Sequence, residues 1–246
     1  MSAIEWTDET WNPTTGCDRV SPGCDHCYAL TMAARLKGMG QAKYQNDGDP
    51  RTSGPGFGLT CHPDALDVPR RWRKARRVFV NSMSDLFHPE VPSSFVAQVF
   101  DVMRDCPQHT FQILTKRPQR MAELGCGATF GEAKGAPNVW LGTSIESDRY
   151  AFRADHLRDT PAAVRFLSLE PLLGPLPSLD LTGIDWVIVG GESGLASRPM
   201  NPAWVRDLRD RCVDADVAFF FKQCGGRTPK ANGRTLDGQT WDEYPT

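Results

Sequence analysis

The feature that most constrains the fold is a series of short apolar runs rich in β-branched and aromatic residues. Each run is almost continuously apolar, as expected for a parallel strand that is buried on both faces. The candidate strands are residues 56–61, 77–82, 110–115, 139–144, 164–169, 185–190 and 218–223, with a shorter and more polar stretch at 4–11. Patterns typical of helices lie between several of these runs, at 30–40, 93–106 and 202–215.

The alternation of strands with helices predicts βαβ units and a parallel sheet. Eight such units close a barrel of about 250 residues, and this chain has 246. An open doubly wound sheet is the alternative, because hydrophobic periodicity does not separate the two. We therefore predict an α/β protein with a single (β/α) barrel, complete or partial, over residues 1–224. Residues 225–246 are rich in Gly and polar residues and are predicted to form an irregular C-terminal cap of the same domain.

The sequence shows no pattern of export or membrane insertion. The N-terminal stretch lacks a basic cluster followed by an apolar run, so we predict no signal peptide. No apolar stretch approaches the roughly 20 residues of a membrane span, which predicts a cytoplasmic protein without a membrane partner. In a reducing compartment, eight cysteines favour metal or redox chemistry over disulfides.

Three of the eight cysteines lie in the loop at 16–29, which reads GCDRVSPGCDHCYA. Cys17 is followed by Cys24 and Cys27, and the last two form a Cys-x2-Cys pair that can chelate a metal from a single turn. The loop is too rich in Gly, Pro and charge to be core. A [4Fe–4S] cluster with three cysteine ligands keeps one iron open, whereas a structural zinc site needs four ligands. The candidates for a fourth zinc ligand are His26, Cys61 and His62.

Polar side chains follow several of the predicted strands. In a barrel the catalytic residues lie at the carboxyl ends of the strands, so these side chains are expected to meet at one mouth. Gathering charges in a partly dry place is costly unless they pair with one another or bind a ligand. Ion pairs that hold the top of the barrel together are therefore the alternative to a binding site. The candidates are Ser82, Asp85, Lys116, Glu170, Gly190, Gly191, Glu192 and Lys222.

A basic stretch at 69–77 has six Arg or Lys residues around one Trp. Such a stretch can bind phosphates and stack on a base, which makes it the candidate contact for nucleic acid. A solvated surface leading into the next strand is the alternative. The formal net charge of −2 for the whole chain gives no global signature of nucleic-acid binding.

The cysteine loop resembles the cluster loop of radical S-adenosylmethionine enzymes, in which three cysteines bind a [4Fe–4S] cluster. The stretch CDHCYA is similar to the photoproduct-lyase-like branch, in which a Tyr or Phe follows the last cysteine. The spacing departs from the usual Cys-x3-Cys-x2-Cys pattern, because three extra residues separate Cys17 from Cys24.

Nearly end to end, the chain also resembles a phage-associated family of three-cysteine proteins, the gene-product-37/gene-product-68 family. The matching stretches include WNPTTGC, SPGCDHCYA, RRVFVNSMSDLFH, QILTKRP, SLEPLLG and VIVGGESG. This resemblance implies a fold and a cluster but no particular reaction.

The resemblance implies roles for the three cysteines, while the strand-end residues are candidates for contacts with cofactor and substrate. Cys17, Cys24 and Cys27 are expected to ligate three irons, the fourth iron to bind S-adenosylmethionine, and an electron donor to reduce the cluster. The candidate cofactor-binding residues are Tyr28, Ser82, Asp85, Lys116, Gly190 and Gly191, with a place in the core as the alternative for Tyr28. The candidate catalytic residues are Glu170, Glu192 and Lys222.

Three functions follow as expectations. The first is an iron–sulfur enzyme of radical S-adenosylmethionine type, with a nucleic-acid base as the candidate substrate. The second is a nucleic-acid-binding module without catalysis, whose cysteine loop is stapled by zinc or a cluster. The third is a [4Fe–4S] lyase or hydrolase that uses the open iron without radical chemistry and needs no reductant.

Overall fold

The computed structural model describes residues 4–228 and 231–245. Residues 1–3 of the predicted barrel domain, and residues 229–230 and 246 of the predicted cap, lie outside the described residues.

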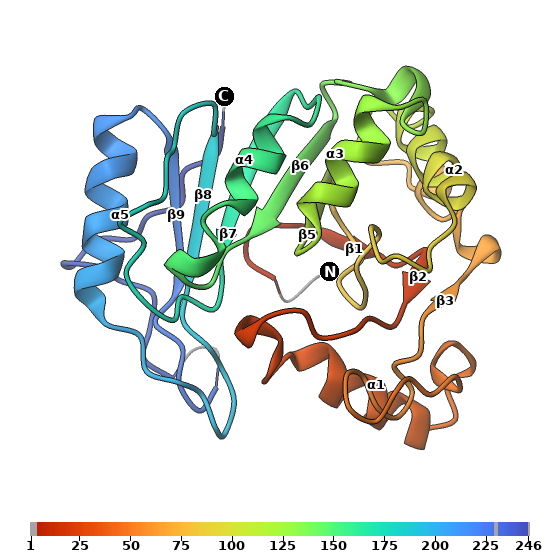
Figure 1. Cartoon of the computed structure of the whole chain (residues 1–246), viewed down its shortest axis with the longest axis horizontal. Coiled ribbons are helices and arrows are strands. Elements are labelled where there is room, and N and C mark those ends of the chain that lie inside the picture. Colours follow the sequence, from red (N-terminus) through yellow and green to blue (C-terminus); the bar gives the residue numbers. More distant parts are fainter. Residues whose placement is uncertain (1–3, 229–230, 246) are drawn as a thin grey trace.

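Seven parallel strands form one sheet, and their order in space follows their order in the sequence (Figure 1). A doubly wound sheet reverses its strand order at a switch point, and this sheet does not. The first and last strands form the two edges, so the predicted (β/α) barrel is partial. The strands are β1 (Glu9–Trp11), β4 (Arg77–Val80), β5 (Thr110–Thr115), β6 (Val139–Ser144), β7 (Val164–Leu169), β8 (Trp186–Gly190) and β9 (Ala218–Gln223).

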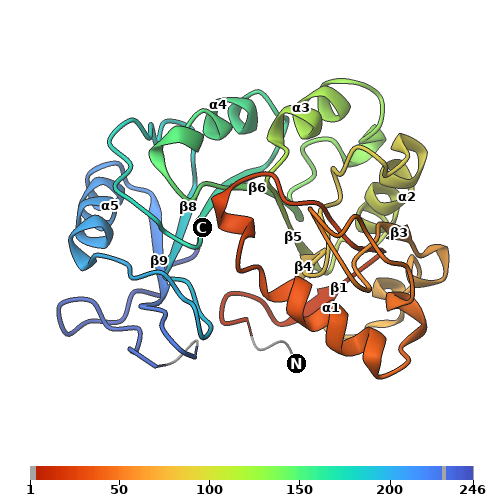
Figure 2. The same cartoon turned by 60° about the horizontal axis from the view of Figure 1, so that its bottom comes forward.

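Four helices cover the outer face of the sheet (Figure 2). They are α2 (Ser93–Arg104), α3 (Pro118–Cys126), α4 (Arg153–Arg158) and α5 (Pro202–Asp214). The helix α1 (Tyr28–Gly38) lies apart from them, beyond the carboxyl ends of the strands (Figure 1). Asn201 caps α5 as its sequence suggests, because its side-chain oxygen accepts a hydrogen bond of 2.9 Å from the backbone N–H of Ala203.

Both faces of the strands are buried, which explains their continuous apolar sequences. Successive side chains point to opposite faces of a sheet. In β4, Val78 and Val80 pack under the outer helices, while Phe79 points inward. The inward side chains form an aromatic cluster of Trp6, Phe79, Phe166, Trp186, Ile188 and Phe220. This cluster fills the interior of the partial barrel and forms the floor under its mouth.

The predicted strand at 56–61 is wrong as a member of the barrel sheet. Only its last two residues are extended, as β3 (Thr60–Cys61), and they pair antiparallel with β2 (Thr14–Thr15) in a separate ribbon. Gly56 has a φ of 67°, which takes the chain out of the extended conformation. The polar stretch at 4–11 supplies the seventh strand instead, through β1.

The described part of the predicted cap, residues 225–228 and 231–245, contains no helix and no named strand. It packs on the last two strands of the sheet. Trp186 Nε1 donates a hydrogen bond of 2.9 Å to the Glu243 carbonyl, and the Trp241 ring stacks edge-on against Phe219. Within residues 4–228 and 231–245, no helix combines the length and apolar composition that crossing a bilayer requires.

Candidate functional site

The cysteine loop is held against the carboxyl end of β4. The backbone N–H of Gly16 donates to the Met83 carbonyl at 3.0 Å, just after that strand. Gly16 has a φ of 87°, and a Cβ atom there would lie 2.3 Å from the Gly58 carbonyl oxygen. Only glycine fits this crossing of two backbone segments. The loop then makes a single 3₁₀ turn at Pro22–Cys24 and enters α1, for which Cys27 is the N-cap residue.

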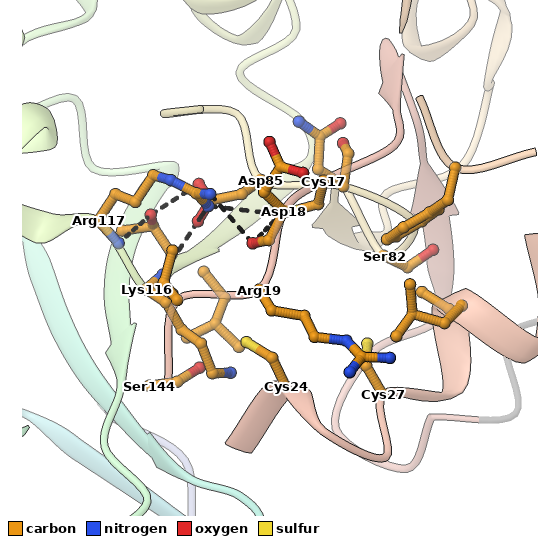
Figure 3. A pocket seen from close by; sticks show the side chains of 18 of the residues that line it. Cys17, Asp18, Arg19, Cys24, Cys27, Ser82, Asp85, Lys116, Arg117 and Ser144 are labelled. Atoms are coloured by element: carbon orange, nitrogen blue, oxygen red, sulfur yellow. Dashed lines mark hydrogen bonds and ion pairs between the residues drawn. The ribbon is translucent and has the colours of Figure 1, made fainter. Parts of the chain in front are cut away.

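All three loop cysteines line one cavity of about 160 Å³ (Figure 3). No fourth cysteine and no histidine line it in the described parts of the chain. The other candidate ligands are engaged elsewhere: His62 Nε2 bonds to Thr15 Oγ1 at 2.8 Å, and Cys61 lies in β3. The remaining lining includes Asp18, Arg19, Tyr28, Asn81, Ser82, Asp85, Lys116, Arg117 and Ser144.

The three thiols share this cavity without converging on one point. Among residues 4–228 and 231–245, no group of three or more His, Cys, Asp or Glu side chains is arranged to hold a single metal ion. A structural zinc site needs four donors, whereas three thiols and no histidine line this cavity in the described parts of the chain. Three thiols are the donor set of a cluster that is held by three cysteines.

A buried charge pair stands beside Cys17. Arg117 Nη1 donates to the Cys17 Sγ at 3.3 Å and to the Asp85 Oδ2 at 3.1 Å, and its Nη2 donates to the Asp18 carbonyl. Burial raises the pKa of the Cys17 thiol to about 12; the Asp85 charge adds to this rise and Arg117 opposes it. Burial also raises the pKa of Cys27. Both thiols are therefore protonated at neutral pH until a metal displaces the protons.

Asp85 is occupied by donors from the protein itself. Besides Arg117, it accepts hydrogen bonds from Thr115 Oγ1 at 2.7 Å and from the Lys116 backbone N–H at 3.1 Å. Its predicted contact with a cofactor stays a prediction, and its visible role is to position Arg117. Ser82 likewise bonds to a neighbour, since its Oγ donates to the Asn12 Oδ1 at 3.2 Å.

Tyr28 and Lys116 lie where the first cavity meets a second one of about 210 Å³. The Tyr28 hydroxyl donates to the Ser82 carbonyl, which ties the start of α1 to the end of β4. Lys116 forms no ion pair with any described residue. It is therefore available to bind an anionic group of a ligand at this junction.

The second cavity brings together the three predicted catalytic residues. Lys222 Nζ lies 2.9 Å from Glu170 Oε1, and Ser168 Oγ donates to the other oxygen of that carboxylate at 3.2 Å. Gly190 makes room for this pair, because a Cβ atom there would lie 2.5 Å from Glu170 Oε1. A Cβ atom on Gly191 would lie 2.2 Å from the Cys224 carbonyl oxygen. The contact of both glycines with a cofactor stays a prediction.

Glu192 fastens the cysteine loop to the end of β8. Its Oε2 accepts hydrogen bonds from the Arg198 N–H and Nε, both at 2.9 Å, and lies 3.0 Å from His26 Nδ1. Arg198 Nη2 reaches on to the Pro22 carbonyl at 2.9 Å. Burial by itself raises the pKa of Glu192, but the hydrogen bonds from Arg198 and His26 outweigh it, and the pKa falls to about 2. Glu192 is thus an ionised anchor at neutral pH.

Three side chains that hold the candidate site together were missing from the candidates drawn from the sequence: Asp18, Arg117 and Arg198. Asp18 Oδ2 lies 3.0 Å from His88 Nε2, and Asp18 Oδ1 accepts hydrogen bonds from the hydroxyls of Thr52 and Ser53. These contacts fix the segment that follows Cys17. Arg117 is the second residue after the predicted strand at 110–115, so its position was a usable signal. Arg198 lies in an irregular segment, and nothing in the sequence links it with Glu192.

The basic stretch at 69–77 lies away from the mouth. It precedes β4, at the amino end of the sheet, whereas both cavities open at the carboxyl end. Three of its cations are paired: Arg70 with Asp67 and Asp105, Arg76 with Glu9, and Arg77 with Asp8. Nucleic-acid binding through this stretch stays a prediction, and such binding would lie outside the cavities.

Fold and site together define an α/β protein with a partial barrel and a three-thiol loop over the carboxyl ends of its strands. The chain belongs to the family described as "Protein of unknown function (DUF5131)", whose profile matches residues 1–245. No curated protein matches the chain. The predicted phage association stays a prediction.

Several solved structures of spore photoproduct lyase are similar to this chain. The lyase in complex with dinucleoside spore photoproduct has 12% sequence identity and a TM-score of 0.45, and the match covers 81% of this chain and 59% of the lyase. A double mutant with bound AdoMet and the dinucleoside also has 12% identity and a TM-score of 0.45, with 82% and 60% covered. This chain thus spans about 60% of the length of these lyases.

Proposed function

We propose that this protein binds a [4Fe–4S] cluster through Cys17, Cys24 and Cys27 and is an enzyme of radical S-adenosylmethionine type. The observation that carries the proposal is the cavity at the carboxyl ends of the strands, which three thiols line without a fourth cysteine or a histidine among the described residues. Three ligands leave one position of a four-iron cluster open for a small molecule.

The second cavity supports the presence of a small molecule beside the cluster. It shares Cys27, Tyr28 and Lys116 with the first cavity, so a ligand can contact both. S-adenosylmethionine carries a carboxylate, and Lys116 is a cation at this junction without an ion-pair partner among the described residues. When bound, cluster and cofactor together supply a 5′-deoxyadenosyl radical by one-electron cleavage of a sulfur–carbon bond. The surrounding protein positions the cofactor and excludes water.

The residues of the second cavity have distinct parts in this proposal. Glu170 and Lys222 form an ion pair whose charges cancel. The pair presents both a hydrogen-bond donor and an acceptor to a substrate. Glu192 acts through Arg198 and His26 and positions the loop that carries Cys24 and Cys27. A nucleic-acid base remains the candidate substrate, and the paired polar groups over an aromatic floor are compatible with a flat, polar ring.

Cleavage of S-adenosylmethionine tests the proposal. Protein reconstituted with iron and sulfide and reduced with dithionite is expected to form 5′-deoxyadenosine. Cys24→Ala is expected to abolish this product, and Cys61→Ala, outside both cavities, is expected to retain it. A fully loaded and reduced protein that yields no 5′-deoxyadenosine contradicts the radical mechanism. Turnover of a substrate without any reductant would favour the lyase or hydrolase function instead.

A further inference from the structure

A third hollow, here called the Cys27 groove, lies outside the two inner cavities. It has a volume of about 520 Å³ and runs between the first turns of α1 and the segment 193–197 that follows β8. Cys27 and Tyr28 line this groove and both inner cavities. The groove is therefore a place where the proposed cluster comes close to the molecular surface.

The surface of the Cys27 groove is unusually apolar for an exposed region. Leu195 has an exposed fraction of 85%, Tyr28 of 55% and Met32 of 41%. Leu30 lines the groove between them. Such a contiguous set of exposed apolar side chains marks an interaction site on a globular protein. Met and aromatic side chains are also enriched at the centres of protein interfaces.

Two arginines at the groove give it a positive rim. Arg19 and Arg35 line it, and neither forms an ion pair with a described residue. The acidic residue of the groove, Asp25, lies 3.6 Å from Arg198 Nη1 and is neutralised by it. The chain as a whole is close to neutral, with a formal net charge of −2, so these two cations give the rim a local positive charge. The matching partner carries negative charge around an apolar centre.

We infer that an acidic protein carrying a low-potential one-electron centre docks in the Cys27 groove and reduces the cluster there. The inference rests on the proposed function, which consumes one electron for each cofactor cleaved. In the transfer step the partner is oxidised by one electron and the cluster is reduced by one, with no bond made or broken. A transient contact of modest area suits such an exchange.

The composition of the groove favours a protein over a nucleic acid. Interfaces with nucleic acid are more polar and far more positively charged than interfaces between proteins. Here only two cations without an ion-pair partner among the described residues line the groove, and Leu30, Met32 and Leu195 lie between them and the segment after β8. Aliphatic side chains of this kind complement a protein surface better than a phosphate backbone.

The test compares two reductants of the cluster-loaded protein. Reduced flavodoxin serves as the acidic protein donor and dithionite as the small donor, with the EPR signal of the reduced cluster as readout. The double variant Arg35→Glu/Leu195→Asp alters the groove. Its matched control is Lys134→Glu/Val213→Asp, which makes the same kinds of change at exposed positions elsewhere.

The groove variant is expected to slow reduction by flavodoxin about tenfold or more at low salt, with a weaker salt dependence than the wild type. Reduction by dithionite is expected to remain unchanged, and the control variant to match the wild type with both donors. Equal flavodoxin rates in wild type and groove variant overturn the inference. So does a groove variant that loses only the binding of a single-stranded oligonucleotide. A wild-type protein that dithionite fails to reduce overturns the proposed function itself.

Discussion

At the scale of single residues, the site consists of charged side chains that are almost all satisfied by one another. Asp85 pairs with Arg117, Glu170 with Lys222, and Glu192 with Arg198. Ion pairs that hold the barrel mouth together were the alternative drawn from the sequence, and the structure contains such pairs. Contacts of these residues with a ligand stay a prediction. The pairs fix the walls, while the thiols and Lys116 are left to face a ligand.

Removing the Arg117 guanidinium leaves the carboxylate of Asp85 buried without its cation. Arg117→Ala is therefore expected to lower the free energy of unfolding of the metal-free protein by about 3 kcal/mol. Urea unfolding measures the effect. Arg71→Ala, an exposed arginine, serves as control and is expected to change stability by less than about 0.5 kcal/mol. If Arg117→Ala lowered the free energy of unfolding by no more than Arg71→Ala does, the pair of Arg117 with Asp85 would contribute little to stability.

The carboxylate of Glu192 links stability to pH. Its pKa is lowered from 4.5 to about 2 in the folded protein, so the folded state binds the proton less readily than the unfolded chain. The stabilisation is complete above pH 4.5 and is lost as the pH falls toward 2. Glu192→Gln is expected to cost about 2 kcal/mol at pH 7 and almost nothing near pH 2.

Urea unfolding of the metal-free protein at several pH values between 2 and 7 measures this dependence for Glu192. Glu132→Gln is the control, because the Glu132 side chain is 87% exposed and its nearest cation is 4.0 Å away. A constant difference between Glu192→Gln and the wild type across this range would contradict the assigned pKa shift.

At the scale of elements, the sequence predicted strands best where both faces of the strand are buried. Six of the seven barrel strands lie at predicted runs because both of their faces are covered, by helices outside and by aromatic rings inside. The seventh, β1, is a short edge strand with half-buried Glu9 and Thr10, so its pattern was weak. The run at 56–61 is apolar because Phe57 packs against α1. The sequence does not show this contact, because it depends on how the loop folds back onto the helix.

The packing between β6 and β7 offers a sharp test at this scale. A Cβ atom on Gly142 would lie 2.6 Å from the ring of Phe166, in the filled interior of the barrel. Gly142→Ala is expected to lower the free energy of unfolding by about 1–3 kcal/mol, because the ring has to move. Gly174→Ala is the matched control, since a Cβ atom there meets nothing within 4 Å. Thermal unfolding of both variants decides the point, and equal Tm values would contradict this packing.

At the scale of the whole molecule, the partial barrel determines where chemistry can occur. The sheet opens between β1 and β9, and the cysteine loop, α1 and the segment after β8 surround the mouth (Figure 2). The cysteines and the strand-end residues were predictable because motif spacing and topology place them. Arg198 and the Cys27 groove were not, since they depend on how loops more than 150 residues apart meet.

The proposed function depends on a cluster bound by three cysteines, and metal analysis measures this binding directly. Protein purified without oxygen is compared with the Cys17→Ala/Cys24→Ala/Cys27→Ala variant, with Cys61→Ala as control. Iron, sulfide and zinc are measured for each. We predict about four irons and four sulfides per chain in the wild type and in the control, and none in the triple variant. One tightly bound zinc per chain without sulfide would contradict cluster binding and indicate a structural zinc site in the loop.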